Sequence, residues 1–526
     1  MSSTSLTNIS QSFSSQLLRL SEKTGHAVPR RTRVCLVIPP SPFLLDERVF
    51  ASLGVLKVAA SLEPFHDVSV LDLSGVENYL DAVRDCPDAE VIGITATTPQ
   101  MPAAMKIART FRATAPNARL VLGGPHVTLV HAAARAEANK PPQTGRSRAA
   151  LTKLANAFDI LVAGDGEKAI HVALSPDAPP IINADDPATT LFLTHKEFTA
   201  SAWPARHLID LESYHYTIDG HKATSIVAQL GCPFQCTFCS GRLSPMLRRI
   251  RLREKSSVIA ELRHLHDTWG YTGFMFYDDE LNVNKNLVPL MRDLVQLQKD
   301  VGSRFALRGF VKSELFTDEQ ADVMREAGFN WLLCGFESGS ERILRNIRKQ
   351  ATTVDNAAML RTAHKHGIHV KALMSLGHAG ETPETIRDTE QWLIAERPDE
   401  FDATVITVYP GSPYYDEAVH VRDDIWRFEI SGDALYSFDL DFTEEQAFYK
   451  GVPGEYKSFV FTDHVGPEEL VSLRDRLESN VRHELGLSWQ TAVTAQRYEH
   501  SMGMGLPGSI LREPPALSET ALAQAV

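Results

Sequence analysis

Three cysteines crowd into one short stretch of the chain, and their side chains could bind metal. Cys232, Cys236 and Cys239 follow the spacing C-x3-C-x2-C within residues 231–240. Three thiolates on one tight loop suit an iron–sulfur cluster, because each can bind a different iron and leave the fourth iron open. A structural zinc site is the alternative, but it needs a fourth ligand, and no further Cys or His occurs before His264. The spacing therefore favours a cluster.

The remaining cysteines do not form a second motif. Cys35, Cys86 and Cys334 each stand alone in sequence, so we interpret them as small packed residues and not as ligands. Six unevenly spaced cysteines in 526 residues are also too few for a disulfide framework.

The cysteine loop follows the first strand of a strand–helix alternation that spans residues 224–417. Short apolar strands alternate there with helical patterns about six times, which predicts a partial parallel (β/α)6 barrel. The chemistry of such barrels lies at the carboxyl ends of the strands, where this loop falls. The tail, residues 418–526, is mixed, and we expect it to bind substrate. One clear helix is predicted in it, from Pro467 to Leu485.

A second alternation, over residues 31–180, predicts a doubly wound, Rossmann-like parallel sheet, so the fold class is α/β. Ligands of such sheets sit beyond the carboxyl ends of the strands. Residues 133–150 lack apolar periodicity and predict an exposed insertion. Residues 181–223 carry several prolines and suit a linker, and residues 1–30 are expected to be a disordered leader.

Composition narrows the classes of partner. The 53 Lys and Arg residues against 66 Asp and Glu give a net charge of −13, which disfavours nucleic acid. No apolar run approaches the roughly 20 residues of a membrane span. The polar leader has no apolar core of a secretory signal. We therefore expect a cytoplasmic protein that binds neither nucleic acid nor membrane.

The cysteine loop resembles the cluster motif of the radical S-adenosylmethionine (SAM) enzymes, and later segments of the barrel resemble the same family in the same order. The resemblance implies that Cys232, Cys236 and Cys239 hold a [4Fe–4S] cluster whose open iron chelates the amine and carboxylate of SAM. Phe238 occupies the aromatic position of the family motif, which implies a place near the adenine.

An acidic segment ends the second strand of the barrel. Asp278 and Asp279 match the acidic variant of a family segment that receives the SAM amino group. Which carboxylate of Asp278, Asp279 and Glu280 points at the ligand stays open. A solvated acidic loop is the alternative for any one of them.

Three later segments complete the implied SAM site. Arg308 could form a bidentate pair with the SAM carboxylate. Glu337 resembles the polar contact of the family to the SAM ribose or amine, with Ser338 as the next candidate. Gly377 and Gly380 resemble a turn at which the backbone approaches adenine closely and side chains would obstruct.

The carboxyl ends of the N-terminal strands resemble the cobalamin-binding domain that precedes many radical SAM domains. A flat corrin needs an open sheet edge with small residues. The implied cobalamin-binding residues are Thr97, Gly123, Gly124, His126, Gly164, Gly166 and Glu167. The Asp-x-His-x-x-Gly pattern of the classical cobalamin mutases is missing, so a base-off cobalamin is implied. For His126, a hydrogen bond to the corrin periphery is favoured over ligation of cobalt.

The resemblance implies a cobalamin-dependent radical SAM methyltransferase that acts on an unactivated carbon of a small metabolite through a 5′-deoxyadenosyl radical and methylcobalamin. The alternative is the same pair of cofactors in a rearrangement, oxidation or C–C bond formation. Methylthiotransferases of tRNA would need three further cysteines upstream, and a non-enzymatic cobalamin sensor leaves the SAM-like segments unexplained. An external electron donor such as flavodoxin or ferredoxin is implied, while substrate-contacting catalytic residues stay unknown.

Overall fold

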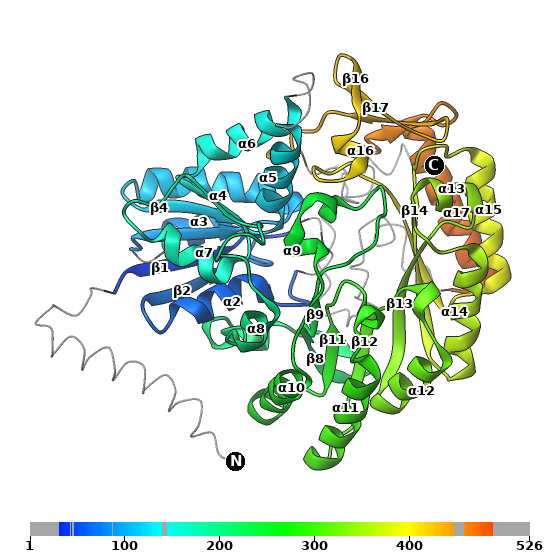
Figure 1. Ribbon diagram of the computed structural model, residues 1–526, viewed down its shortest axis with the longest axis horizontal. Coiled ribbons are helices and arrows are strands. Elements are labelled where there is room, and N and C mark those ends of the chain that lie inside the picture. The colour runs from blue at the N-terminus through cyan, green and yellow to red at the C-terminus, as the bar shows by residue number, and fades with distance from the viewer. Residues whose placement is uncertain are drawn as a thin grey trace, which may run out of the picture.

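The described chain contains two large, mainly parallel sheets and two small antiparallel sheets, and Figure 1 shows the computed structural model. The structure describes residues 31–42, 44, 47–86, 88–138, 145–445 and 457–487. The predicted leader lies outside these residues, as does the end of the predicted C-terminal region.

The first sheet has six parallel strands in the order β2-β1-β3-β4-β5-β6. Helices α3 to α6 pack on one face, and α2 and α7 pack on the other, so the central strands are buried on both faces and are mainly apolar, whereas the edge strand β2 is partly exposed and half polar. The strands are β1 (Arg33–Ile38), β2 (Asp67–Asp72), β3 (Val91–Thr95), β4 (Arg119–Gly123), β5 (Ile160–Gly164) and β6 (Ile181–Ala184). The helices are α2 (Leu53–Leu62), α3 (Tyr79–Arg84), α4 (Met101–Thr114), α5 (Pro125–Glu137), α6 (Arg146–Ala157) and α7 (Gly166–Ala173).

The structure differs from two expectations for this half of the chain. The predicted insertion at residues 133–150 is wrong at both ends, because α5 continues to Glu137 and α6 begins at Arg146. Alanines such as Ala133 and Ala134 are buried there, and alanine supports a helix without a stripe of large apolar residues. Strand β6 lies beyond the predicted domain end at residue 180, inside the predicted linker.

The second sheet is the predicted partial barrel, with strand order β15-β14-β13-β12-β11-β8-β7. Strands β8 and β11 to β15 are parallel, and β7 joins β8 in an antiparallel hairpin. The strands are β7 (Thr217–Ile218), β8 (His221–Ile226), β11 (Gly273–Phe276), β12 (Ala306–Phe310), β13 (Phe329–Glu337), β14 (His369–Leu376) and β15 (Glu400–Val405). The outer helices are α10 (Lys255–Trp269), α11 (Leu287–Val301), α12 (Asp318–Ala327), α13 (Glu341–Asn346), α14 (Thr353–Lys365) and α15 (Pro383–Glu396).

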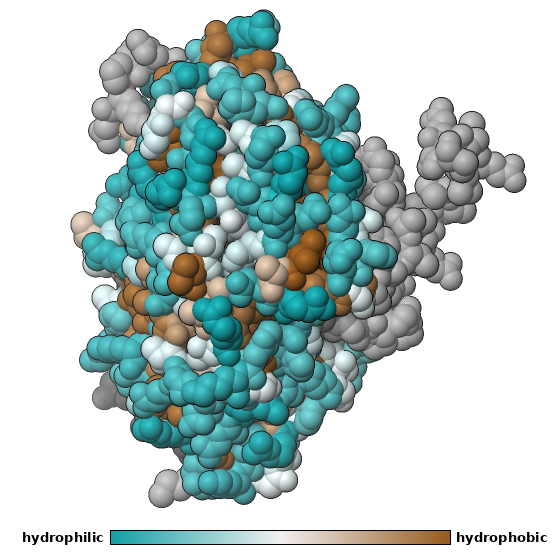
Figure 2. All heavy atoms as spheres, turned by 90° about the vertical axis from the view of Figure 1, so that its right-hand side faces the viewer, coloured by the Kyte–Doolittle hydropathy of each residue, from teal (hydrophilic) through white to brown (hydrophobic). Residues whose placement is uncertain are grey.

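The C-terminal region adds an antiparallel sheet and the predicted helix, α17 (Pro467–Leu485), which packs on α15 and β15. The strands are β16 (Val419–Arg422), β17 (Ile425–Ile430), β18 (Asp433–Phe438) and β19 (Val460–Phe461). Figure 2 shows that this side of the molecule is largely hydrophilic, with small separate apolar patches. Within the described chain, no helix combines the length and the apolar character that crossing a membrane requires.

Buried polar contacts join the first domain to the barrel. Arg251 donates to both carboxylate oxygens of Asp165, at 2.9 and 2.7 Å, and both side chains are buried. Asp185, which follows β6, accepts hydrogen bonds from Ser244 Oγ at 2.8 Å and from Met246 N at 2.7 Å. Ser244 and Met246 lie shortly after the cysteine loop. The first domain therefore holds the segment that carries the cluster ligands.

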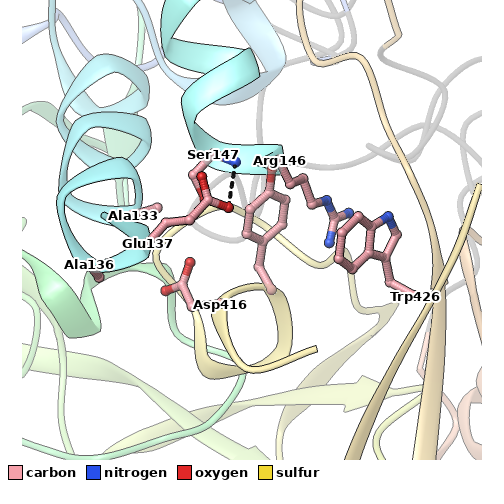
Figure 3. A pocket seen from close by; sticks show the side chains of 8 residues that line it. Ala133, Ala136, Glu137, Arg146, Ser147, Asp416 and Trp426 are labelled. Carbon is pink, nitrogen blue, oxygen red and sulfur yellow. Dashed lines mark hydrogen bonds between the residues drawn. The ribbon is translucent and has the colours of Figure 1, made fainter. Parts of the chain in front are cut away.

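A cation also joins the first domain to the C-terminal region. The Arg146 guanidinium lies between the rings of Tyr415, 3.7 Å away, and Trp426, 4.7 Å away, beside a small pocket that Glu137 also lines (Figure 3). Its Nε donates to Asp439 at 2.7 Å. Such stacked guanidinium groups are favourable when they are desolvated. Arg146 thus stabilises the joint between the first domain and the tail.

Candidate cofactor site

The cysteine loop lies between β9 (Gln229–Leu230) and a 3-10 helix, η4 (Ser240–Leu243), at the carboxyl edge of the barrel. Its backbone is fixed by other segments: Cys232 N donates to Leu247 O at 3.0 Å, and Thr237 N donates to Ile347 O at 2.9 Å. Gly231 opens the loop with φ +92°, and a Cβ there would lie 2.2 Å from Arg249 O. Only glycine fits this turn, so the sequence context fixes the start of the loop.

The three thiols of the loop suit the predicted cluster. Cys236 is buried and Cys232 is half-buried, whereas Cys239 is exposed. Burial raises the pKa of all three thiols, that of Cys232 to about 12, and binding of thiolates to iron would offset this cost. The exposed thiol of Cys239 is accessible from outside the loop. In the part of the chain that the structure describes, no group of three His, Cys, Asp or Glu side chains is placed to hold a single metal ion. Cluster thiolates bind separate irons.

Two carboxylates after β11 hold the backbone of the loop. Asp278 Oδ1 accepts from Ala228 N at 2.7 Å, and Asp279 Oδ2 accepts from Gly231 N at 2.9 Å. Burial raises the pKa of Asp278 to about 7, and its Oδ2 is buried without a hydrogen-bond partner. These contacts give both residues a positioning role, while their predicted contact with the SAM amine stays a prediction.

Glu280 is the carboxylate of this segment that the backbone does not engage. Burial raises its pKa to about 7, and the charges of Lys349 and Lys312 oppose that rise. Asp278 and Asp279 each use one oxygen for the backbone, whereas the Glu280 carboxylate accepts no hydrogen bond within the described chain. Asp278 Oδ2 also has no partner, so both Glu280 and Asp278 keep oxygens for a ligand.

Two buried lysines belong to the site, and no sequence motif singled them out. Lys312 is 1% exposed; its Nζ donates to Lys349 O at 2.8 Å and lies 4.4 Å from the ring centroid of Phe234 in the cluster loop. Lys349 is 5% exposed, and its Nζ lies 3.0 Å from Glu337 Oε1. A lysine within an otherwise ordinary helix–loop segment gives no signal of this convergence.

Glu337 begins a hydrogen-bonded chain of buried side chains. It ends β13 with φ +66°, where the register with β14 shifts. Its Oε2 accepts from Ser375 Oγ at 2.8 Å, Ser375 Oγ lies 2.8 Å from His378 Nε2, and His378 Nδ1 lies 3.2 Å from Tyr414 Oη. The ring of Phe238 lies 5.4 Å from that of His378. The chain thus connects the predicted SAM-contacting glutamate to the predicted adenine-side aromatic ring.

Charge is distributed unevenly along this chain. Burial would raise the pKa of Glu337, but Lys349 and the hydrogen bonds hold it below its usual value. Burial lowers the pKa of His378 to about 4, so this imidazole is neutral near pH 7. The only charged pair in this chain of contacts is therefore Lys349 with Glu337.

The other predicted SAM residues are engaged by the protein itself. Ser338 Oγ lies 3.1 Å from Thr389 Oγ1 on α15. A Cβ on Gly377 would lie 2.8 Å from Leu470 Cδ2, and one on Gly380 would lie 2.6 Å from Asp433 Cγ. The C-terminal region therefore fills the space over both glycines. Their close approach to adenine stays a prediction.

Arg308 is directed toward the hairpin that precedes the cluster loop. It donates from NH1 to Tyr216 Oη at 2.9 Å, and NH2 lies 3.7 Å from Asp219 Oδ1. Asp219 lies in the β7–β8 turn, at the amino-terminal end of β8, whereas the cluster loop lies beyond its carboxyl end. The predicted pairing with the SAM carboxylate stays a prediction, and these contacts favour a structural role.

The carboxyl edge of the first sheet has its topological switch between β1 and β3, which is where ligands of doubly wound sheets bind. Thr97 is exposed there. Gly123 meets nothing within 4 Å at the position of a Cβ, so a ligand can approach its backbone. Gly124 has φ +96° and packs against Thr95. The edge is open where the predicted corrin would lie.

His126 is buried at this edge and is 2% exposed. Its Nδ1 lies 3.1 Å from Thr98 Oγ1, its ring lies 6.1 Å from that of Phe442, and burial lowers its pKa to about 4. These contacts favour a neutral, packed histidine.

The predicted Gly-x-Gly-Glu turn after β5 is explained by packing. A Cβ on Gly164 would lie 2.3 Å from Ala184 C, and one on Gly166 would lie 2.7 Å from Val58 Cγ2. Glu167 lies 3.3 Å from Lys57 Nζ. The turn lies at the carboxyl end of β5, and its contact with cobalamin stays a prediction.

Comparisons with known proteins agree with both halves of this arrangement. The Radical SAM superfamily model matches residues 226–393, and the B12 binding domain model matches residues 47–155. An uncharacterized methyltransferase of Pyrococcus horikoshii is 27% identical over 402 residues, which cover 74% of this chain and 83% of that protein. The anaerobic magnesium-protoporphyrin IX monomethyl ester cyclase of Cereibacter sphaeroides is 22% identical over 413 residues, 76% of this chain and 63% of that protein.

A solved structure shows the same fold. The radical S-adenosylmethionine methyltransferase TsrM of Kitasatospora setae, with cobalamin and a [4Fe–4S] cluster bound, aligns with a TM-score of 0.57 at 19% identity. The alignment covers 76% of this chain and 82% of that one. The predicted order of a doubly wound domain and then a partial barrel is confirmed.

Proposed function

We propose, from the premise that this chain belongs to the cobalamin-dependent radical SAM enzymes, that it transfers a methyl group to an unactivated carbon of a small metabolite. The predicted family and enzyme class are confirmed, as are the [4Fe–4S] cluster, SAM and cobalamin as cofactors. The methyltransferases among the relatives support the reaction type. The acceptor carbon and its metabolite are the proposed part.

The observation that carries the proposal is the meeting of the two domains at the cluster loop. A Cβ on Gly411 would lie 2.4 Å from Ser240 O, next to the loop, and 3.5 Å from Leu129 O on α5 of the first domain. The accessible thiol of Cys239 lies next to Ser240 in the chain. The open sheet edge and the open face of the loop therefore belong to one interdomain region.

In this region the protein would position the cofactors and exclude water. Cys232, Cys236 and Cys239 would hold the cluster, Glu280 with the two lysines would bind the charged groups of SAM, and Phe238 would cover the adenine. The sheet edge would hold the corrin. When they are bound, the cluster and SAM supply a carbon-centred radical, and cobalamin supplies the methyl group. The domain joint keeps the reacting groups close and shields them from water.

The setting of the reaction follows from its cofactors. A reductive step needs an external one-electron donor, and flavodoxin or ferredoxin fits this requirement. We place the enzyme in the cytoplasm, where thiols stay reduced. The C-terminal region packs over Gly377 and Gly380, close to the hydrogen-bonded side chains that run from Glu337 to Tyr414. We propose that this region selects the substrate.

The test uses anaerobic, reconstituted protein, a reductant and SAM labelled in its methyl group, without added substrate. We expect the label to accumulate in the protein-bound cobalamin fraction, with release of one S-adenosylhomocysteine per label. A cobalamin fraction that stays unlabelled would contradict methyl transfer. Free cobalamin at the same concentration is the control for reaction in solution.

The alternative is a non-methylating reaction with the same cofactors. It is favoured by the similarity to the magnesium-protoporphyrin cyclase, which covers 76% of this chain. Such an enzyme has no need to methylate cobalamin, so the same labelling experiment separates the two functions.

A further inference from the structure

Positive charge gathers around the cluster loop of a chain whose net charge is −13. Arg242 lies in η4, Arg248 ends α9 (Pro245–Arg248), and Arg348 follows α13. The cluster loop joins the three segments, because Arg242 and Arg248 both donate to its carbonyl oxygens, and Thr237 N of the loop donates to Ile347 O, next to Arg348, at 2.9 Å. We call Arg242, Arg248 and Arg348 the arginine surface.

No carboxylate neutralises this surface within the described parts of the chain. Arg242 donates to Gln235 O, and Arg248 donates to Phe234 O and, at 2.6 Å, to Pro233 O. These acceptors are neutral carbonyl oxygens of the cluster loop, so neither guanidinium is paired with a carboxylate.

Neighbouring arginines behave differently. Arg251 pairs with Asp165, and Arg206 and Arg253 both pair with Glu261, and all of these side chains are buried. The chain therefore pairs the arginines that it buries and leaves unpaired those that surround the cluster loop.

The arginine surface is near both the solvent and the cluster ligands. Pro233, Gln235 and Arg348 are exposed, so the outer edge of the loop reaches the surface. Arg242 and Arg248 donate to carbonyl oxygens of residues 233–235, which lie between Cys232 and Cys236, so both guanidinium groups lie beside the cluster ligands. In Figure 1, α9 lies between the two sheets, apart from the outer helices of the barrel.

We propose that the arginine surface docks a small acidic redox protein, which delivers one electron to the cluster. This inference rests on the proposed function, because it needs a cluster that must be reduced. In the step, the reduced donor loses one electron and the oxidised cluster gains it, and no bond forms or breaks. An acidic chain repels other acidic proteins, so a local positive surface is needed to steer a donor to this loop.

The test compares two reductants on the full, reconstituted chain. Arg348→Glu reverses a charge that makes no contact with the loop carbonyls. Arg109→Glu, on α4, is the matched control, since Arg109 is also exposed and has no ion pair among the described residues. Cluster reduction is followed by absorbance in stopped flow, first with reduced flavodoxin and then with photoreduced deazariboflavin, a small molecule without net charge.

We expect Arg348→Glu to lower the second-order rate constant with flavodoxin about three- to tenfold at low salt, and less at high salt because salt screens the attraction. The rate with deazariboflavin should stay within about twofold, as should both rates of Arg109→Glu. An equal loss with both reductants would show that the arginine acts on the cluster itself. An equal loss in Arg109→Glu would assign the effect to net charge. Either outcome would overturn the proposal.

The readout separates this inference from the proposed function. Cluster reduction does not depend on which group is later transferred, so a specific effect of Arg348→Glu would stand even if no methyl group were moved. A reconstituted chain without a reducible cluster would overturn both.

Discussion

At the carboxyl edge of the barrel, buried lysines and carboxylates converge around the cluster loop, whereas the edge of the first sheet presents hydroxyls, glycines and a neutral histidine. The ion pairs of Lys349 with Glu337 and of Lys312 with Glu314 represent the first type, and Thr97 and Gly123 represent the second. The ligands differ accordingly: SAM carries separate charges that need partners, while a corrin needs a wide, open edge. We therefore expect the barrel edge to bind SAM by charge and the sheet edge to bind cobalamin by shape.

The largest expected effect is the loss of one cofactor site while the other is kept. Replacing Cys232, Cys236 and Cys239 together by Ala should remove cluster absorbance and all SAM cleavage, and the protein should still bind one cobalamin, because the sheet edge has its own contacts. Iron content, the visible spectrum and cobalamin stoichiometry measure this. Loss of both cofactors from a folded chain would show that the edges are not independent.

Removing one charge from the barrel edge should have the next largest effect, a loss of stability. Lys349→Met leaves Glu337 as an unpaired buried carboxylate, which costs about 3–5 kcal/mol of unfolding free energy. The added change Glu337→Gln should recover part of that loss, since it removes the stranded charge. Urea unfolding of the two variants and the parent measures both numbers. A Lys349→Met variant within about 0.5 kcal/mol of the parent would contradict a tightly coupled pair.

A backbone change in the cluster loop should have a smaller effect. Gly231→Ala places a Cβ against Arg249 O at a positive φ and should cost about 1–3 kcal/mol and lower the iron content. Gly486→Ala is the matched control, because Gly486 has φ +67° but open space around it, and it should cost about 1 kcal/mol or less. Equal costs for the two variants would mean that the close approach does not matter.

The contact between the two domains should give the smallest effect, and it depends on pH. Burial raises the pKa of Asp185 from 3.8 to about 6. The folded state then binds more protons than the unfolded state between these values, so this residue's contribution to stability falls as pH rises from about 4 to 6. Asp185→Asn should flatten that dependence and be more stable than the parent at pH 7 by on the order of 1 kcal/mol. Unfolding curves at pH 4.5 and pH 7 check this, and an unchanged slope would contradict it.

The sequence predicted the barrel edge better than the sheet edge, for a physical reason. An iron–sulfur cluster requires cysteine ligands, so the spacing of Cys232, Cys236 and Cys239 could be recognised in the sequence. The apolar strands predicted both large sheets. Lys312 and Lys349 were missed because a single buried lysine carries no local pattern. Gly164 and Gly377 were assigned to cofactors, yet the structure shows neighbouring chain where their side chains would be. Glycine in a sequence signals a close approach, but it does not say to what.

The most direct test of the whole account is the stoichiometry of a complete turnover. Anaerobic enzyme, reductant, SAM labelled in its methyl group and a protein-free extract of small metabolites are incubated together, and both nucleosides and the label are followed. The account predicts a labelled product accompanied by equal amounts of 5′-deoxyadenosine and S-adenosylhomocysteine, because one SAM supplies the radical and another supplies the methyl group. A product without label that is accompanied by 5′-deoxyadenosine alone would contradict the account.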